Sequence, residues 1–267
     1  MTRRIVDFHT HAFPDALAAR AMKALLEEAP GIQAYLDGTV GELLWSMDRT
    51  GIEKSVVCCI ATRPEQFEPI LAWCVQIRSD RLLPFPSVHP ADPSAADRVR
   101  RIAQEGFQGV KLHPYYQDFF ADEDRMFPLY EAVDRSNLLL VMHTGYDIAF
   151  PRIRRADPQK ILMVKEWFPN LKLVATHLGA WRQWDEVQRE LIGRNVPMEI
   201  SFALDELDVE DARAMILGHP EGCVLFGTDS PWTDQGRTLA LLEQLQLPDA
   251  TLRSILAANA LSLLNLA

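Results

Sequence analysis

The sequence is poor in cysteine and has no excess of positive charge. It contains 4 cysteines in 267 residues and no Cys-x-x-Cys pair, so neither a disulfide framework nor a cysteine zinc site is indicated. Lysine and arginine number 27 against 37 aspartate and glutamate residues, which gives a formal net charge of -10. That charge repels phosphate groups and anionic lipids, so we expect no nucleic-acid partner.

Long hydrophobic runs are missing as well. The apolar stretch after Arg3 and Arg4 stops at Asp7, which is too short for the core of a signal peptide, and no segment of the sequence resembles a membrane span. Together with cysteines that look like reduced thiols, this predicts a cytoplasmic protein with no membrane partner.

Short apolar runs are present along the whole chain and are typical of buried parallel strands. They cover residues 5–8, 55–60, 82–88, 109–112, 138–142, 171–175, 196–202 and 223–226. Segments with helical period lie between them, so strand and helix alternate. Alternation over this length predicts an α/β fold, and we expect one TIM-type (β/α)8 barrel domain spanning residues 1–267. An open doubly wound sheet would give the same pattern.

Several segments between the runs have helix-start signals. Residues 39–42 form a capping box, and the pairs Asp157-Pro158 and Asp92-Pro93 each combine a capping aspartate with a proline suited to the first helical turn. The longest irregular stretch, residues 12–38, has a helical pattern around residues 17–26. We expect this stretch to cover the mouth of an active site.

Polar side chains stand where several of the expected strands end. His9 and His11 are two residues apart, so both imidazoles point to the same side of the first strand. His143, His177 and Asp229 each follow another apolar run. Because all strand ends share one face of a barrel, and barrel enzymes place catalytic groups there, we expect these five groups to lie close together.

Imidazole and carboxylate groups in this arrangement indicate a divalent metal ion. Zinc is the default expectation for nitrogen and oxygen ligands, although manganese, iron or cobalt fit the same donors. An ion of this kind turns bound water into a nucleophile near neutral pH.

The chain resembles the amidohydrolase superfamily, in the amidohydrolase-related type 2 branch that includes aminocarboxymuconate semialdehyde decarboxylase. The resemblance covers nearly the full length. The motifs that carry it are Val6-Asp7-Phe8-His9-Thr10-His11, Gly109-Val110-Lys111-Leu112-His113-Pro114, Met142-His143-Thr144-Gly145, Thr176-His177-Leu178-Gly179 and Phe226-Gly227-Thr228-Asp229-Ser230-Pro231-Trp232.

The resemblance implies roles for particular residues. It identifies four metal ligands, namely His9, His11, His143 and Asp229, and it implies that His177, together with Asp229, moves protons. Lys111 stands where binuclear relatives use a carboxylated lysine to bridge two ions. A single ion is more usual in the type 2 branch, so we expect one ion, with Lys111 as an ammonium that binds substrate.

Groups just beyond the strand ends are candidates for substrate contact. These residues are His113, Tyr115, Arg63, Trp181 and Trp232. They would bind a small molecule, which is the partner we expect. A homodimer is the commonest assembly of soluble oligomers, but no stretch of the sequence marks its interface.

Four functions compete at this stage. The first, which we favour slightly, is a hydrolase in which metal-activated water attacks the carbonyl of an ester, lactone or amide. The alternative is a decarboxylase that acts on an aromatic or unsaturated acid with the same metal site. A TatD-like nuclease is opposed by the charge and by Lys111, which stands where that family needs an acidic ligand. A metal-free binding barrel is opposed by the retention of every expected ligand. Fold analogy alone does not choose the reaction.

Overall fold

Parallel strands alternate with helices along the whole chain in a computed structural model, which describes residues 3–266. The strands are β1 (Val6–Thr10), β2 (Lys54–Cys58), β3 (Leu82–Phe85), β4 (Gly109–Leu112), β5 (Leu139–Met142), β6 (Lys172–Ala175), β7 (Met198–Glu199) and β8 (Val224–Leu225). The order of these strands in the chain is also their order around the molecule.

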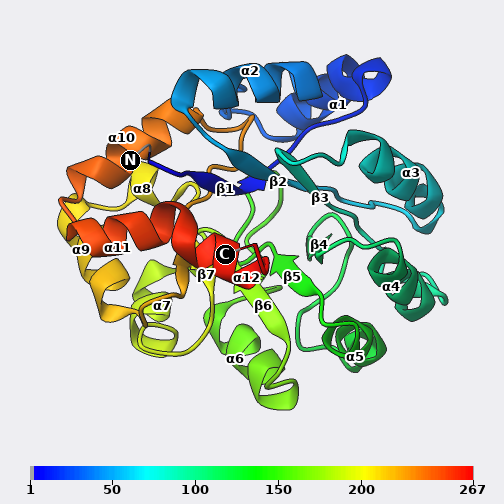
Figure 1. Cartoon of the computed structure of the whole chain (residues 1–267). Coiled ribbons are helices and arrows are strands. Elements are labelled where there is room, and N and C mark those ends of the chain that lie inside the picture. The colour runs from blue at the N-terminus through cyan, green and yellow to red at the C-terminus, as the bar shows by residue number, and fades with distance from the viewer. Residues whose placement is uncertain (1–2, 267) are drawn as a thin grey trace.

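The helices form an outer ring around the strands (Figure 1). The α-helices are α1 (Asp15–Glu28), α2 (Val40–Thr50), α3 (Phe67–Ile77), α4 (Ala95–Gln104), α5 (Phe127–Arg135), α6 (Pro158–Trp167), α7 (Trp184–Glu190), α8 (Ala203–Glu206), α9 (Val209–Gly218), α10 (Gln235–Gln244), α11 (Asp249–Arg253) and α12 (Asn259–Leu263). Two short 3-10 helices are η1 (Pro64–Gln66) and η2 (Asp124–Met126), and η3 (Ser254–Ala258) is a π-helix. Among residues 3–266, no helix has the length and apolar character needed to cross a bilayer.

Strand pairing gives two sheets, one of β1 to β3 and one of β4 to β8, and backbone hydrogen bonds close them into a barrel. At one seam the Lys111 amide donates to the Pro86 carbonyl at 2.9 Å, and at the other the Phe8 amide donates to the Phe226 carbonyl at 2.9 Å. The predicted TIM-type (β/α)8 barrel is therefore confirmed.

Alternating residues of the strands fill the barrel interior. Phe8, Val141 and Val174 pack in a buried apolar cluster, and Ala260 and Leu261 of the C-terminal helix belong to the same cluster. Helix α12 lies in front of the barrel centre in Figure 1 and contacts β1 and β8. Side chains therefore fill the barrel interior at the end covered by α12. The carboxyl ends of the strands, at the opposite end, remain available to form a site.

Two of the three predicted helix starts are confirmed, although the capping box at residues 39–42 is only half formed, because the Thr39 amide donates to the Asp37 carboxylate at 2.8 Å and not to Glu42. The Thr39 hydroxyl accepts a hydrogen bond from the Glu42 amide at 3.2 Å, and the Asp157 carboxylate accepts one from the Lys160 amide at 3.3 Å. The prediction at Asp92 is wrong, because α4 begins only at Ala95. There the Asp92 carboxylate accepts from the Ser94 amide at 2.8 Å and so forms a turn before the helix.

The apolar runs predicted the strands but overestimated their length near the end of the chain. The runs at 196–202 and 223–226 shorten to the two-residue strands β7 and β8. The backbone turns left-handed at Phe202, where φ is 57°, and at Asp229, where φ is 59°. The extra apolar residues are buried in loops, so hydrophobicity did not distinguish them from strand.

Candidate metal centre

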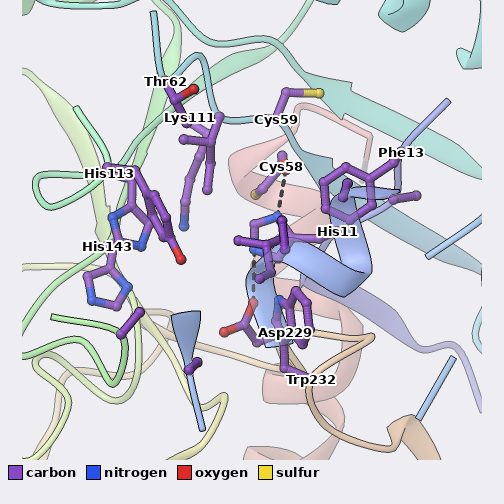
Figure 2. A pocket seen from close by; sticks show the side chains of 18 of the residues that line it. His11, Phe13, Cys58, Cys59, Thr62, Lys111, His113, His143, Asp229 and Trp232 are labelled. Atoms are coloured by element: carbon purple, nitrogen blue, oxygen red, sulfur yellow. Dashed lines mark hydrogen bonds and ion pairs between the residues drawn. The ribbon is translucent and has the colours of Figure 1, made fainter. Parts of the chain in front are cut away.

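The carboxyl ends of the strands gather the polar side chains that the sequence singled out. His9 comes from β1 and Lys111 from β4, whereas His143, His177 and Asp229 follow β5, β6 and β8. All five line one cavity of about 640 Å³. Figure 2 shows the Lys111 side chain pointing into this cavity, between His113 on one side and His11 on the other.

Three of the four predicted metal ligands converge on one point. The Nε2 atom of His11 lies 3.2 Å from Nε2 of His9 and 2.9 Å from Oδ1 of Asp229. The Nε2 atom of His9 lies 3.4 Å from the same oxygen. Donor atoms at these separations can share a single ion, so His9, His11 and Asp229 form the core of a candidate metal site.

The outer nitrogens of both imidazoles are held by hydrogen-bond acceptors. Nδ1 of His9 lies 3.1 Å from Oε1 of Glu199, and Nδ1 of His11 lies 2.8 Å from the Cys58 carbonyl oxygen. Each Nδ1 therefore carries the proton and donates it, which leaves the lone pair on Nε2. Partners of this kind orient metal-binding histidines in proteins.

The carboxylate of Asp229 also fits a cation. Burial raises the pKa of this carboxyl, but the facing imidazoles of His9 and His11 lower it by more, so that the pKa lies below its usual range. The group is therefore ionised. Its Oδ1 atom is buried and makes no hydrogen bond of good geometry within residues 3–266. A buried, charged oxygen without a hydrogen bond is costly, and a metal ion would satisfy it.

A second buried aspartate fixes the loop that carries Asp229. The Asp7 carboxylate accepts hydrogen bonds from the Thr228 amide at 3.0 Å, from the Thr228 hydroxyl at 2.6 Å and from the Gln235 side chain at 2.8 Å. These bonds tie the end of β8 to β1 across the barrel seam. The left-handed backbone at Asp229 is a strained conformation that this network maintains.

His177 lies next to the three converging ligands. One ring nitrogen of His177 lies within 4.8 Å of a donor atom of His9 and of a donor atom of Asp229. Its Nδ1 atom is 2.9 Å from the hydroxyl of Ser201 and 3.3 Å from the Ser201 carbonyl oxygen. Burial lowers the pKa of His177, so its resting state is neutral and able to accept a proton.

His143, the fourth predicted ligand, is one step further out. Its Nδ1 lies 3.1 Å from Nε2 of His177, and its Nε2 donates to the Tyr146 carbonyl at 2.9 Å. Its ring stacks on that of His113 with centroids 4.1 Å apart. His143, His113 and Asp147 form a second group whose donor atoms lie within 4.8 Å of one another. Ligation of the ion by His143 remains a prediction.

Lys111 is a buried residue inside the barrel. It pairs in register with Val141, which pairs with Val174 on the next strand, so the lysine occupies an interior position among apolar neighbours. Its exposed fraction is 0%. Its Nζ lies 2.9 Å from Nε2 of His9, and within residues 3–266 it makes no ion pair with a carboxylate. A buried ammonium without a counter-charge is costly unless a ligand supplies the charge.

Glu199 was missed by the sequence analysis. It is buried on β7, and besides holding His9 it accepts hydrogen bonds from the His177 amide at 2.9 Å and from the Ser201 amide at 2.7 Å. A Cβ atom on Gly227 would stand 2.3 Å from Oε2 of Glu199, which explains the glycine before Thr228-Asp229. The signal was present in the sequence, since Glu199 is a charged residue between Met198 and Ile200 in an apolar run.

Three of the five predicted substrate contacts line the cavity, namely His113, Trp181 and Trp232. Trp181 is fixed by its neighbours, because its indole donates to the Glu206 carboxylate at 3.2 Å. A Cβ on Gly145 would meet the Trp181 backbone nitrogen at 2.1 Å, so this motif glycine permits the close approach of the Trp181 segment.

The other two predicted contacts do not line the cavity. Tyr115 is buried beside the cavity wall and donates its hydroxyl hydrogen bond to the carbonyl of Ile153, so it stabilises a loop and does not line the cavity. Arg63 is exposed at the start of η1 and also lies outside the cavity lining. Position after a strand was not enough to predict the direction of either side chain.

A family profile described as Amidohydrolase matches residues 6–266. Among curated proteins, no sequence matches the chain.

Solved structures with the same fold cover nearly the whole chain. An uncharacterized TIM-barrel protein from Bordetella bronchiseptica has a TM-score of 0.80 at 21% identity, covering 98% of this chain and 99% of its own. The 5-carboxyvanillate decarboxylase of Sphingomonas paucimobilis has a TM-score of 0.74 at 17% identity, covering 100% of both chains. A dihydroxybenzoic acid decarboxylase from Polaromonas sp. JS666, solved with manganese and 2-nitroresorcinol, has a TM-score of 0.74 at 14% identity, covering 99% of this chain and 98% of its own.

Proposed function

Because this chain belongs to the amidohydrolase family, we propose that it is a metal-dependent carboxy-lyase that removes CO₂ from an aromatic or unsaturated carboxylic acid. The structural similarity to two decarboxylases of aromatic acids supports this reaction over hydrolysis. Hydrolysis of an ester, lactone or amide, which the sequence slightly favoured, becomes the second candidate.

The observation that carries the proposal is the fully buried Lys111 side chain, which makes no ion pair with a carboxylate among residues 3–266. Its hydrogen-bond partner is Nε2 of His9. An ion at the metal site would bind the lone pair of the same nitrogen. With the ion in place, the ammonium would need a negative group from the substrate. A carboxylate supplies that charge, whereas an ester, lactone or amide carbonyl does not.

The metal site would be held by His9, His11 and Asp229, with His143 as the further ligand that the family resemblance implies. A divalent ion there would polarise substrate oxygens and stabilise the negative charge that develops as the carboxylate leaves. Manganese is supported by its presence in the Polaromonas decarboxylase structure, and zinc by the imidazole-rich donor set.

Loss of CO₂ leaves an electron pair on carbon, which must take up one proton. His177 is the group we assign to deliver it, because this imidazole is neutral at rest and can take a proton from solvent or substrate. Ser201 holds Nδ1 of His177, so we assign the transfer to Nε2, which faces Nδ1 of His143 at 3.1 Å. The carbon–carbon bond breaks, CO₂ departs, and the proton from His177 replaces the carboxylate.

The position of His177 also supports hydrolysis as the second candidate. His177 is a neutral base within 4.8 Å of two candidate ligands, a position from which it could deprotonate a water molecule at the metal. The same residues would then direct that water at a carbonyl.

The test is a direct measurement of products. Protein loaded separately with manganese and with zinc is incubated with hydroxybenzoic acids, unsaturated acids, aryl esters and lactones, and CO₂ release is followed alongside loss of each compound. We expect CO₂ from at least one acid, and about tenfold to a hundredfold slower release at a sub-saturating concentration of that acid when Lys111→Met replaces the wild type. Turnover of esters or lactones without CO₂ would overturn the proposal in favour of hydrolysis. Elemental analysis of the same samples should give one ion per chain.

A further inference from the structure

The cavity that contains the metal site extends well beyond it. Its floor is polar and holds the histidines, Lys111 and Asp229, but the same cavity continues along α1. The residues of α1 that line it are Leu17, Arg20, Ala21, Ala24 and Leu25. These positions lie on one side of the helix, whereas Ala18 and Met22 are buried against the rest of the protein. The predicted cover of the active-site mouth is thus also a wall of the pocket.

The wall that faces the cavity from the second strand–helix connection is apolar too. It contains Ile60, Pro69, Ile70 and Trp73, which come from the end of β2 and from α3. Only Thr62 and Gln66 add polar atoms on this side. The cavity therefore has a charged floor and an upper part that is apolar apart from Arg20, Thr62 and Gln66.

Two large hydrophobic side chains at the rim of the cavity are exposed to solvent. Leu17 has an exposed fraction of 43% and Ile148 one of 39%, and both line the cavity. Exposed apolar surface that is continuous with a polar reactive site is typical of a ligand-binding groove.

The size of the cavity exceeds the needs of a simple aromatic acid. Its volume is about 640 Å³. At roughly 30 Å³ for each water-sized or methylene-sized unit, this space takes about 20 non-hydrogen atoms, about twice the number in a monohydroxybenzoate. A small ring acid bound at the floor would leave the apolar part filled with water.

We propose that the substrate is an amphiphilic acid, in which a carboxylated ring binds at the floor and an alkyl chain of about eight to ten carbons lies between α1 and α3. This inference rests on the proposed function for the head of the molecule, which Lys111 and the metal site would hold. The tail is assigned from the apolar lining alone. Burial of the chain would supply most of the binding energy, while the floor would orient the carboxylate.

Binding of 2-hydroxy-6-alkylbenzoates with chains of one to nine carbons tests the proposal. The metal-loaded His177→Asn variant is used in calorimetry so that binding is measured without turnover. We expect affinity to rise about threefold to fourfold for each added methylene group until the cavity is full. Equal affinity for the methyl and nonyl compounds would overturn the inference.

A matched pair of variants locates the tail. Ala24→Trp places an indole on the face of α1 that lines the cavity, and Ala19→Trp places the same group on an exposed position of the same helix outside the lining. We expect Ala24→Trp to weaken binding of the nonyl compound at least tenfold while binding of the methyl compound is unchanged, which also shows that the site is folded. Equal binding of the nonyl compound by both variants would place the tail elsewhere and overturn the inference.

Turnover assays separate this inference from the proposed function. Chain-length-dependent binding without CO₂ release from any acid would retain the amphiphilic ligand and reject decarboxylation. Decarboxylation of short acids with no effect of chain length on affinity would retain the reaction and reject the tail.

Discussion

Oε1 of Glu199 lies 3.1 Å from Nδ1 of His9, and both side chains are fully enclosed in the barrel. The carboxylate fixes which nitrogen of His9 is protonated and so presents Nε2 to the metal. Glu199→Gln keeps the size of the side chain and removes its charge, and we expect metal affinity to fall about 10- to 100-fold. Titration of metal-free protein with manganese and zinc against a competing chelator measures this change.

The matched control is Glu53→Gln, which removes a carboxylate from an exposed pair with Arg4. This variant should bind metal like the wild type. Wild-type affinity in Glu199→Gln would mean that Glu199 does not tune the site.

Replacing His177 should separate chemistry from metal binding. His177→Asn removes the proton-transferring nitrogen, so we expect turnover to fall by about two to four orders of magnitude, with metal content unchanged. Rates and elemental analysis on one preparation measure both quantities. His89→Asn serves as the control, because His89 lies outside the cavity lining and should leave the rate unchanged. A wild-type rate in His177→Asn would remove this residue from the mechanism.

Lys111→Met retains the buried carbon chain and removes the ammonium. Loss of a charge-assisted hydrogen bond should weaken binding of a carboxylate substrate or inhibitor about tenfold to a hundredfold. Metal content is measured alongside, because a fall from two ions to one would identify Lys111 as a bridging ligand, whereas one ion before and after supports an ammonium. Lys23→Met, at an exposed site on α1, should change neither quantity.

Metal removal should lower thermal stability. A ligand present at about a hundred times its Kd stabilises the folded state by about 2.7 kcal/mol. For a chain of this size that corresponds to a rise in Tm of about 5 to 10 °C, which thermal unfolding with chelator and with added manganese or zinc measures. The His9→Ala/His11→Ala variant should show no rise, and stoichiometric metal in that variant would contradict the ligand assignment.

A histidine far from the cavity should contribute to acid sensitivity. His219 is buried, and burial lowers its pKa although its Nε2 donates to the Val196 carbonyl at 2.9 Å. The folded state therefore holds His219 neutral, whereas the unfolded chain binds a proton near pH 6.5, so the free energy of unfolding decreases as the pH falls below that value.

Replacement by glutamine removes this titration. Urea unfolding of metal-free wild type and His219→Gln at pH 7 and pH 5 should show a smaller loss of stability for the variant. Metal-free protein is used so that the histidines of the site contribute equally to both. The same loss in both proteins would exclude His219 as a source of the pH dependence.

The fold and the floor of the site were predictable because both depend on local patterns. Apolar runs of strand length identified the barrel, and polar residues at the ends of these runs identified His9, His11 and Asp229 as neighbours. The carboxyl ends of all strands lie on one face of a closed barrel, so position in the sequence was enough to predict that these groups lie close together.

Other features depend on distances that no local pattern contains. Glu199 meets His9 across 190 positions of the chain, and the direction of the Tyr115 hydroxyl depends on a loop carbonyl at Ile153. Likewise, α1 was predicted as a cover for the site, but its apolar lining face could be identified only once the opposite wall, from β2 and α3, was in place.

The division of the barrel into two sheets relates metal binding to the order of folding. His9 belongs to β1, in the sheet of β1 to β3, and His11 directly follows β1, whereas Asp229 follows the last strand of the other sheet. The donor atoms therefore meet only after the two sheets have joined at the correct seam, and a chain with one sheet formed has no complete site. Metal uptake should then be a late event in refolding, and the bound ion would mark those molecules in which assembly has been completed.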